Sequence, residues 1–287
     1  MTPPLMFDGR LAQSFPWLVA DIGGSNARFG WLSGPQAGVQ HVRTLPVAGH
    51  AHLADAVRAY LGGLASVLGD AFRPPRRAAF AVATAVAGDL VDLTNSHWSF
   101  SRAALRDELG LDSLAVLNDF EALALALPRL DESQLRAFGP AAGAHQGTLA
   151  VIGPGTGLGV AGVVSTRAGW VALAGEGGHA TLSAADDFES ELLARVRKHY
   201  EHVSAERLLS GIGLPVLHSA VADVLALAAQ PLSAEAIVDR GVAASDPVCV
   251  RTLDVFCALL GSFAGNVALT LGARGGVYIG GGIVPRL

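Results

Sequence analysis

The segment that most constrains this fold is residues 18–32, LVADIGGSNARFGWL. A short apolar run ends at Ile22, a glycine pair follows, and apolar residues then alternate with polar or small ones. This pattern predicts two antiparallel strands joined by a tight turn, because glycine adopts the backbone angles that such turns need. The tip exposes backbone N–H groups and short polar side chains that can hold a phosphate. Taken alone, however, most Gly-Gly hairpins are only turns.

The same pattern returns 132 residues later in the chain. Residues 148–164, TLAVIGPGTGLGVAGVV, again give an apolar strand, a glycine tip and an apolar strand. A third glycine group flanks the strand VYI near the C-terminus, where backbone can approach a flat ligand closely. Two glycine hairpins, one in each half, can hold a polyphosphate between two domains. The candidate cofactor-binding residues of the two tips are Asp21, which can hold a magnesium ion through water, and Gly23, Gly24, Ser25, Asn26, Gly153, Gly155, Thr156 and Gly157.

The pair Asn118-Asp119 lies between a predicted short strand and a predicted helix. The strand covers residues 114–117, and the helix begins near Phe120 and ends at Pro128. Because ligands collect at the carboxyl ends of strands in α/β folds, Asp119 can serve as a base that deprotonates an attacking hydroxyl, as a kinase of alcohols requires. The local pattern by itself favours a simpler role for Asp119, the N-cap of the helix.

Two other segments carry polar residues suited to a small polar substrate. Thr94 and Asn95 interrupt an apolar run, and a sugar hydroxyl would satisfy them, although an ordinary turn explains them equally well. Glu176 and His179 lie three residues apart around two glycines. Such a pair can suggest a metal, but a carboxylate with a neutral imidazole also satisfies hydroxyls that both donate and accept.

Hydrophobic periodicity predicts the remaining elements. Strands are expected within residues 41–49, 77–89 and 91–101. Helices are expected over residues 52–68, 101–109, 184–200 and 246–271, and a further helix is expected to begin at Ser204 with Glu206 in its first turn. The region 246–271 is interpreted as a buried helix rather than a membrane span, because a serine, an asparagine and two glycines interrupt it.

Composition narrows the classes of function. A length of 287 residues with 51% hydrophobic and 16% charged residues predicts a large buried core, and the two hairpins favour two domains. The net charge of −5 argues against a nucleic-acid partner, since the only basic cluster, Arg73 with Arg76 and Arg77, is small. Two cysteines exclude a disulfide framework, and the N-terminus lacks a signal-peptide pattern. We therefore expect a cytoplasmic protein with no membrane partner.

Seven motifs follow one another along the chain. They are DIGGSN (21–26), LTNSHW (93–98), LNDFEA (117–122), GPGTGLG (153–159), GEGGH (175–179), SAERLLSG (204–211) and IGGGI (279–283). Together they resemble the bacterial glucokinase family, which belongs to the actin-like ATPases alongside hexokinases and other sugar kinases. The resemblance runs from about residue 17 to the last residue. It implies an α/β fold, the two-domain actin-like ATPase (ribonuclease H-like) fold, with mixed sheets flanked by helices and an interdomain cleft.

The resemblance also implies an activity and roles for individual residues. The activity is ATP-dependent phosphorylation of the 6-hydroxyl of D-glucose, with Asp119 as general base and Mg²⁺ bound by Asp21 through water. The nucleotide would lie near Ser210, and its adenosine against Gly280, Gly281 and Gly282. The partners are glucose and ATP, and a homodimer is expected. The sugar-binding residues would be Thr94, Asn95, Asn118, Asp119, Glu176, His179 and Glu206.

One departure from related sugar-binding proteins bears on metal content. A related group of repressors and kinases follows its Glu-x-x-His site with a cysteine-rich zinc motif. Here no cysteine follows His179 at that place, so no structural zinc is expected, and a DNA-binding sugar sensor is disfavoured.

The expected organisation is a flexible leader (1–14), a small α/β domain (15–130) and a large α/β domain (131–287). The family's usual C-terminal return helix has no counterpart here, from which we expect reduced stability or activity. Two alternative hypotheses stay open: a kinase for another hexose, such as fructose or mannose, and a non-catalytic regulator that binds sugar or nucleotide. ATP and polyphosphate would use the same tips, so the phosphoryl donor also stays open.

Overall fold

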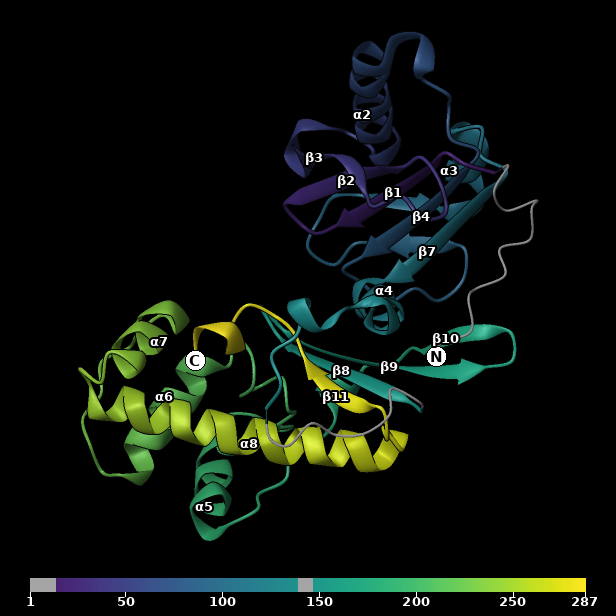
Figure 1. Cartoon of the computed structure of the whole chain (residues 1–287). Helices are drawn as coiled ribbons and strands as arrows, with labels where there is room; N and C mark the ends of the chain where they lie inside the picture. Colours follow the sequence, from purple (N-terminus) through teal and green to yellow (C-terminus); the bar gives the residue numbers. More distant parts are fainter. Residues whose placement is uncertain (1–13, 139–146) are drawn as a thin grey trace. The chain divides into compact units, whose positions relative to one another are not determined.

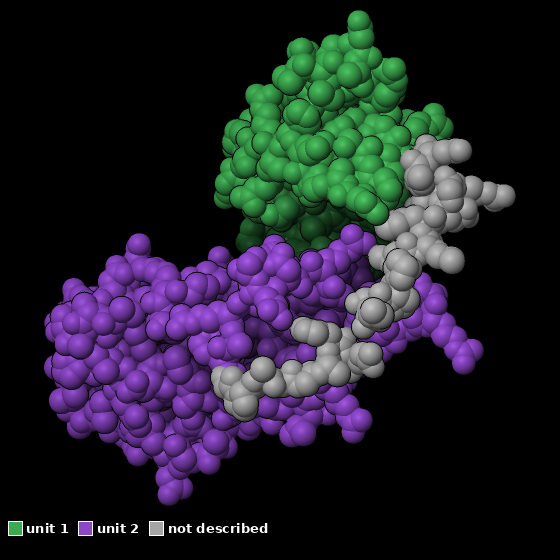
Figure 2. All heavy atoms as spheres, viewed as in Figure 1, with its two compact units in different colours: residues 1–122 green, residues 123–287 purple. Residues whose placement is uncertain are grey.

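The structure, a computed structural model, describes residues 14–138 and 147–287. It forms two compact units, coloured separately in Figure 2, with unit 1 ending at Ala122 and unit 2 beginning at Leu123. This division falls inside one helix, ahead of the junction at residues 130 and 131 expected from the sequence. Nearly all of the expected leader, and a short part of the expected large domain, lie outside the described residues.

Unit 1 is built on a five-stranded mixed sheet in the order β3-β2-β1-β4-β7 (Figure 1). Strand β1 pairs antiparallel with β2 and parallel with β4, and β4 pairs parallel with β7. The β1–β2 hairpin confirms the pattern that predicted it, with Ile22 opposite Ala27. The strands are β1 (Trp17–Ile22), β2 (Asn26–Leu32), β3 (Gln40–Pro46), β4 (Arg77–Val82) and β7 (Ser113–Asn118), and a separate ribbon joins β5 (Leu90–Asp92) to β6 (Ser99–Ser101).

The helices of unit 1 cover apolar side chains of this sheet. Helix α2 packs on β2 and β3, where the ring of Tyr60 stacks on Phe29 at 5.4 Å between centroids. Burial raises the pKa of Tyr60 to about 12, and its hydroxyl donates to the carbonyl of His41 at 3.1 Å. The Ser101 hydroxyl accepts from the N–H of Ala104, so the predicted N-cap is confirmed. The helices are α2 (Leu53–Leu68), α3 (Arg102–Glu108) and α4 (Asp119–Ala126), the last crossing into unit 2.

Unit 2 repeats the strand order of unit 1 in a four-stranded sheet, β10-β9-β8-β11. Strand β8 pairs antiparallel with β9 and parallel with β11, as β1 does with β2 and β4. The offset of 132 residues aligns Ile22 with Pro154, the last residues of β1 and β8. The repeat seen in the two tips therefore extends to the surrounding strands. These are β8 (Leu149–Pro154), β9 (Leu158–Thr166), β10 (Gly169–Leu173) and β11 (Gly276–Ile279).

Helix α8 (Pro247–Leu271) is the longest element of unit 2 and confirms the predicted bounds. The carboxylate of Asp246 caps its N-terminus, and Gly272 ends it in the left-handed conformation. By length and composition it could cross a membrane, but half of its apolar window is buried, as expected of a core helix. It packs against α6 and α7. The other helices are α5 (Asp187–Val196), α6 (Leu214–Val224) and α7 (Ala234–Val242).

Two helix predictions in unit 2 need correction. Helix α5 is shorter than the expected 184–200, because the carboxylate of Asp186 caps it at 187. The helix expected from Ser204 is wrong: residues 204–213 form turns, and the next helix begins at Leu214. The hydroxyl of Ser204 does accept from a backbone N–H three residues on, as a cap would. One turn follows, in which the N–H of Leu209 donates to the carbonyl of Ala205 at 2.8 Å. It does not continue as a helix, because the N–H groups of Gly211 and Ile212 donate instead to the carbonyls of Gly155 and Thr156.

Candidate active site

The first glycine tip, in unit 1, is a closed turn with unused donors. The N–H of Gly23 donates to the carbonyl of Asn26 at 2.9 Å, which fixes the turn. Among the described residues, the N–H groups of Gly24 and Ser25 have no acceptor, so they are free to face an anion. A Cβ added to Gly24 would lie 2.5 Å from the carbonyl oxygen of Asn95. The tip therefore lies directly against the loop that carries Thr94 and Asn95.

The start of helix α4 carries the Asn118-Asp119 pair. The Oδ1 of Asn118 accepts from the N–H of Phe120 at 2.9 Å, and the N–H of Asn118 donates to Glu121 Oε2 at 2.9 Å. This reciprocal pattern is a capping box with Asn118 as the capping residue. The interpretation of Asp119 as the N-cap is therefore wrong. Asp119 Oδ1 also accepts from the Phe120 N–H, at 2.9 Å.

The electrostatics of unit 1 favour Asp119 as a base. Burial raises the pKa of Asp119 above its ordinary value, the carboxylate of Asp21 raises it further, and the N–H of Phe120 opposes both. A higher pKa makes a carboxylate a better proton acceptor. The sequence analysis missed Arg28, which pairs across the hairpin with Asp21 at 3.7 Å and is a cation beside the first tip. Only the strand register, which the hairpin pattern itself contains, would have revealed it.

A second residue missed from the sequence is Thr84. Its hydroxyl donates to the carbonyl of Asp92 at 3.0 Å and lies 3.2 Å from Thr94 Oγ1. Its carbonyl accepts from Asn118 Nδ2 at 3.2 Å. Thr84 therefore joins the loop that carries Thr94 to the side chain of Asn118. The available signal was the same as for Thr94, a small polar residue inside an apolar run.

The second glycine tip, in unit 2, is held from one side by the SAERLLSG segment. The N–H of Leu158 donates to Glu206 Oε2 at 2.8 Å, and the N–H of Gly211 donates to the carbonyl of Gly155 at 2.8 Å. Among the described residues, the N–H groups of Thr156 and Gly157 have no acceptor. The second tip therefore offers donors to an anion as the first does.

The loop that carries Glu176 and His179 meets the same segment. His179 Nε2 lies 4.0 Å from Glu176 Oε2, and both side chains are exposed. His179 and Glu206 line one cavity of about 460 Å³. Arg207 forms another part of its wall, where its guanidinium lies 4.4 Å from the ring centroid of Tyr200. This cavity is large enough for a hexose and presents the donors and acceptors that its hydroxyls need.

The C-terminal glycine group lies beside the end of β8. The N–H of Gly280 donates to the carbonyl of Ile152 at 2.8 Å. Gly281 has φ +81°, and a Cβ there would collide with the carbonyl of Pro154, so only glycine fits. Ser210 is fully buried, and its hydroxyl donates to the carbonyl of Glu206 at 2.7 Å. Its expected place near the nucleotide stays a prediction.

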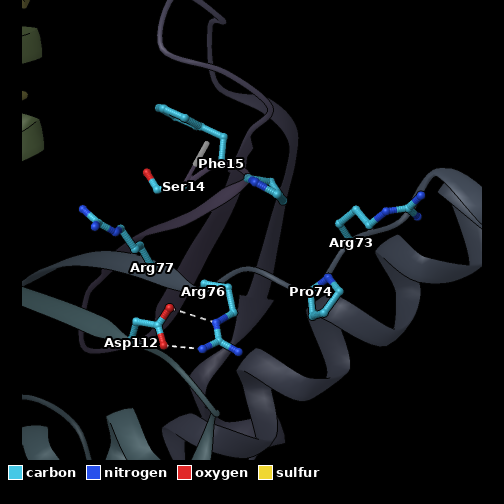
Figure 3. Close-up of a pocket in the computed structure, with 8 residues that line it drawn as sticks. Ser14, Phe15, Arg73, Pro74, Arg76, Arg77 and Asp112 are labelled. Carbon is cyan, nitrogen blue, oxygen red and sulfur yellow. Dashed lines mark hydrogen bonds and ion pairs between the residues drawn. The ribbon is translucent and has the colours of Figure 1, made fainter. Parts of the chain in front are cut away.

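A further cavity, of about 490 Å³, lies at the opposite end of the unit 1 sheet (Figure 3). It is bordered by Arg77, the first residue of β4, and by Asp112, which directly precedes β7. Asp119 instead directly follows the carboxyl end of β7. Arg76 is paired with Asp112, and Figure 3 shows the guanidinium groups of Arg73, Arg76 and Arg77 pointing apart. This cavity is therefore separate from the candidate site.

The described residues thus fall into two sets. The set in unit 1 is Asp21, Gly23, Gly24, Ser25, Asn26, Thr94, Asn95, Asn118 and Asp119. The set in unit 2 is Gly153, Gly155, Thr156, Gly157, Glu176, His179, Glu206, Ser210, Gly280, Gly281 and Gly282. The first contains the candidate base, and each contains one glycine tip and candidate sugar ligands.

Comparisons with known proteins agree on one family. The family model described as Glucokinase matches residues 18–287. A glucokinase of Aromatoleum aromaticum is 49% identical over 276 residues, covering 96% of this chain and 82% of that protein. The crystal structure of a glucokinase from an Antarctic psychrotroph superposes with a TM-score of 0.86 at 39% identity, covering 94% of this chain and 84% of that one.

More distant structures share the fold. Glucokinase from Balamuthia mandrillaris, solved with glucose, has a TM-score of 0.70 at 21% identity and covers 95% of this chain and 82% of its own. A ROK family glucokinase from Streptomyces griseus, solved with glucose and AMPPNP, has a TM-score of 0.58 at 18% identity, covering 95% and 85%. The actin-like ATPase fold expected from the motifs is thereby confirmed. With the family model matching nearly its whole length, this chain belongs to the glucokinase family.

Proposed function

We propose that this protein is an ATP-dependent glucokinase that converts D-glucose to glucose 6-phosphate at the entry to glycolysis. The observation that carries the proposal is Asp119, a half-buried carboxylate of raised pKa at the carboxyl end of β7, in a chain of the glucokinase family. The two distant relatives solved with glucose, one of them also with AMPPNP, support the choice of ligands.

The proposed chemistry needs one base and one set of sugar ligands. Asp119 accepts the proton of the glucose 6-hydroxyl as that oxygen attacks the γ-phosphorus of ATP. A bond forms between O6 and phosphorus, the bond from phosphorus to the β–γ bridging oxygen breaks, and ADP leaves. Asn118 lies beside the base, held by its cap and by Thr84. The other sugar ligands are Thr94, Asn95, Glu176, His179 and Glu206.

The phosphates would bind to the free N–H groups of the two tips, and the adenosine would lie at Gly280 to Gly282. The residues present also fit Mg²⁺, which prefers hard oxygen donors and keeps several waters. Asp21 supplies such an oxygen, and its carboxylate already disfavours the charged form of Asp119, a repulsion that a nearby cation would relieve. When bound, Mg²⁺ neutralises charge on the β- and γ-phosphates.

A panel of sugars and donors tests the proposal. Purified protein is assayed with glucose, fructose and mannose, each with Mg-ATP, Mg-ADP or polyphosphate, and the product is identified by ³¹P NMR. We expect glucose with ATP to give the highest kcat/KM and glucose 6-phosphate as product. Higher kcat/KM on another hexose would favour a kinase for that sugar. Calorimetric glucose binding without turnover would favour a regulator.

Two further properties are proposed with the activity. We expect the enzyme in the cytoplasm, in keeping with its two free cysteines, Cys249 and Cys257. We also expect a homodimer, as the resemblance implies. Sedimentation equilibrium checks the second expectation, since a monomer would contradict it.

A further inference from the structure

The carboxylate of Glu206 lies between the sugar-side cavity of unit 2 and the second glycine tip. Glu206 lines that cavity together with His179. At the same time its Oε2 accepts a hydrogen bond of 2.8 Å from the N–H of Leu158. Leu158 is the first residue of β9 and directly follows Gly157 of the tip. A single carboxylate therefore contacts both candidate ligand sites of this unit.

The backbone around Glu206 is fixed to both neighbouring loops. Its N–H donates to the carbonyl of Gly178 at 2.9 Å, which ties it to the loop of Glu176 and His179. Five residues on, the N–H of Gly211 donates to the carbonyl of Gly155 at 2.8 Å. These two bonds fix the backbone that carries Glu206 beside the tip.

Gly157 gives independent support for this close approach. A Cβ added there would collide with Glu206 Oε2, and among the described residues, chain neighbours aside, its one other contact within 4 Å is the carboxyl carbon of the same side chain. The φ angle of Gly157 lies outside the left-handed region that favours glycine. The space for a side chain at this position is therefore limited by the carboxylate of Glu206 and not by the backbone conformation.

We propose that Glu206 is a positioning residue for the second phosphate tip, in addition to its role toward the sugar. By fixing the N–H of Leu158, its carboxylate holds Thr156 and Gly157 with their own N–H groups free for the nucleotide phosphates. Its remaining lone pairs stay available to a sugar hydroxyl, so sugar and nucleotide share one side chain. This inference rests on the proposed function, because it assumes that the tip binds the phosphates of a nucleotide.

The first test is nucleotide binding in the absence of sugar. The full chain is titrated with Mg-AMPPNP by calorimetry, using Glu206→Ala, Glu206→Gln and, as a matched control, Glu235→Ala, whose exposed carboxylate lies on α7. Loss of a hydrogen bond to a charged group is expected to weaken AMPPNP binding on the order of tenfold in Glu206→Ala. Glu206→Gln keeps an acceptor for the Leu158 N–H and should stay within about twofold of wild type, as should the control.

A role confined to the sugar predicts a different result. Both Glu206 variants would then weaken glucose binding while leaving AMPPNP affinity unchanged, and this outcome would overturn the inference. If wild type phosphorylates glucose in that case, the proposed function stands without it. Failure of wild type to bind AMPPNP at all would overturn both.

The second test uses Gly157→Ala, alone and combined with Glu206→Ala. Alone, the added methyl group displaces the carboxylate, and AMPPNP binding should weaken about as much as in Glu206→Ala. In the double variant the methyl group meets no carboxylate, so it should add less than about twofold. Circular dichroism and thermal melting verify that each variant is folded. Additive losses in the double variant would show that Gly157 and Glu206 act independently and would contradict the inference.

Discussion

Replacing either of two adjacent glycines in the first tip should have very different consequences. A Cβ on Gly23 would lie 3.6 Å from its nearest neighbour, an ordinary contact, whereas a Cβ on Gly24 would lie 2.5 Å from the carbonyl oxygen and 2.8 Å from the Cβ of Asn95. Neither glycine has a φ in the left-handed region, so backbone strain does not separate them. The difference is set by the loop that carries Asn95.

The size of the effect follows from these distances. Carbon atoms in contact normally lie about 3.5 to 4 Å apart, so the Asn95 backbone would have to move by about 1 Å to admit the Gly24→Ala methyl group. Such overpacking typically costs about 1 to 3 kcal/mol. For a unit of roughly this size that corresponds to a Tm loss on the order of 5 to 10 °C. The displaced loop also carries Thr94, so the KM for glucose should rise.

Differential scanning calorimetry and glucose kinetics on both variants check this prediction. Gly23→Ala should melt within about 2 °C of wild type, as expected for a surface substitution without a clash. Gly24→Ala should melt well below it, with a raised KM for glucose. Equal melting temperatures for the two variants would refute the packing of the tip on the Asn95 loop.

Three further predictions concern other parts of the molecule. Thr84→Val removes the hydroxyl contacts to Asp92 and Thr94. It should raise the KM for glucose by about fivefold with little change in the KM for ATP, since one hydrogen bond contributes about 1 kcal/mol. Equal changes in the two KM values would contradict this prediction. Burial lowers the pKa of His218, although the carboxylate of Asp246 opposes this shift. Because the unfolded chain then binds the proton more readily than the folded chain, the free energy of unfolding should fall as the pH drops below about 6.5. Urea unfolding at pH 7.5 and pH 5.5 should show a smaller loss of this free energy in His218→Leu than in wild type. Because the pKa of Asp119 is raised, the acid limb of the pH profile of kcat/KM should lie above the ordinary pKa of an aspartate. In Asp21→Asn this limb should shift to lower pH, and an unshifted limb would argue against electrostatic coupling of Asp21 and Asp119.

Local sequence pattern was sufficient for the elements that frame the site. The apolar runs on either side of the two glycine tips predicted both hairpins. The repeat between the two tips extends to the strand order of both sheets. Helix α8 was predicted at both ends, because proline at the first turn and a glycine after the last are strong local signals. These features depend on backbone preferences that each segment carries by itself.

The remaining features depend on contacts between distant segments. Ser204 has a local capping signal, but the N–H groups of Gly211 and Ile212 donate to the second glycine tip, so the turn after Ser204 does not continue as a helix. The partners of Thr84 depend on which segments lie beside it in the fold, and that information is absent from its own neighbours in sequence. The bond from Leu158 to Glu206 likewise joins residues far apart in the chain.

The substitution Asp119→Asn tests the central claim most directly, through turnover at saturating glucose and Mg-ATP. It keeps the size of the side chain and removes the base. We expect kcat to fall by roughly a hundredfold or more, while calorimetry shows glucose still bound. The melting temperature should be no lower than that of wild type, because a desolvated charge has been removed. Turnover equal to that of wild type would contradict the assignment of Asp119 as the base.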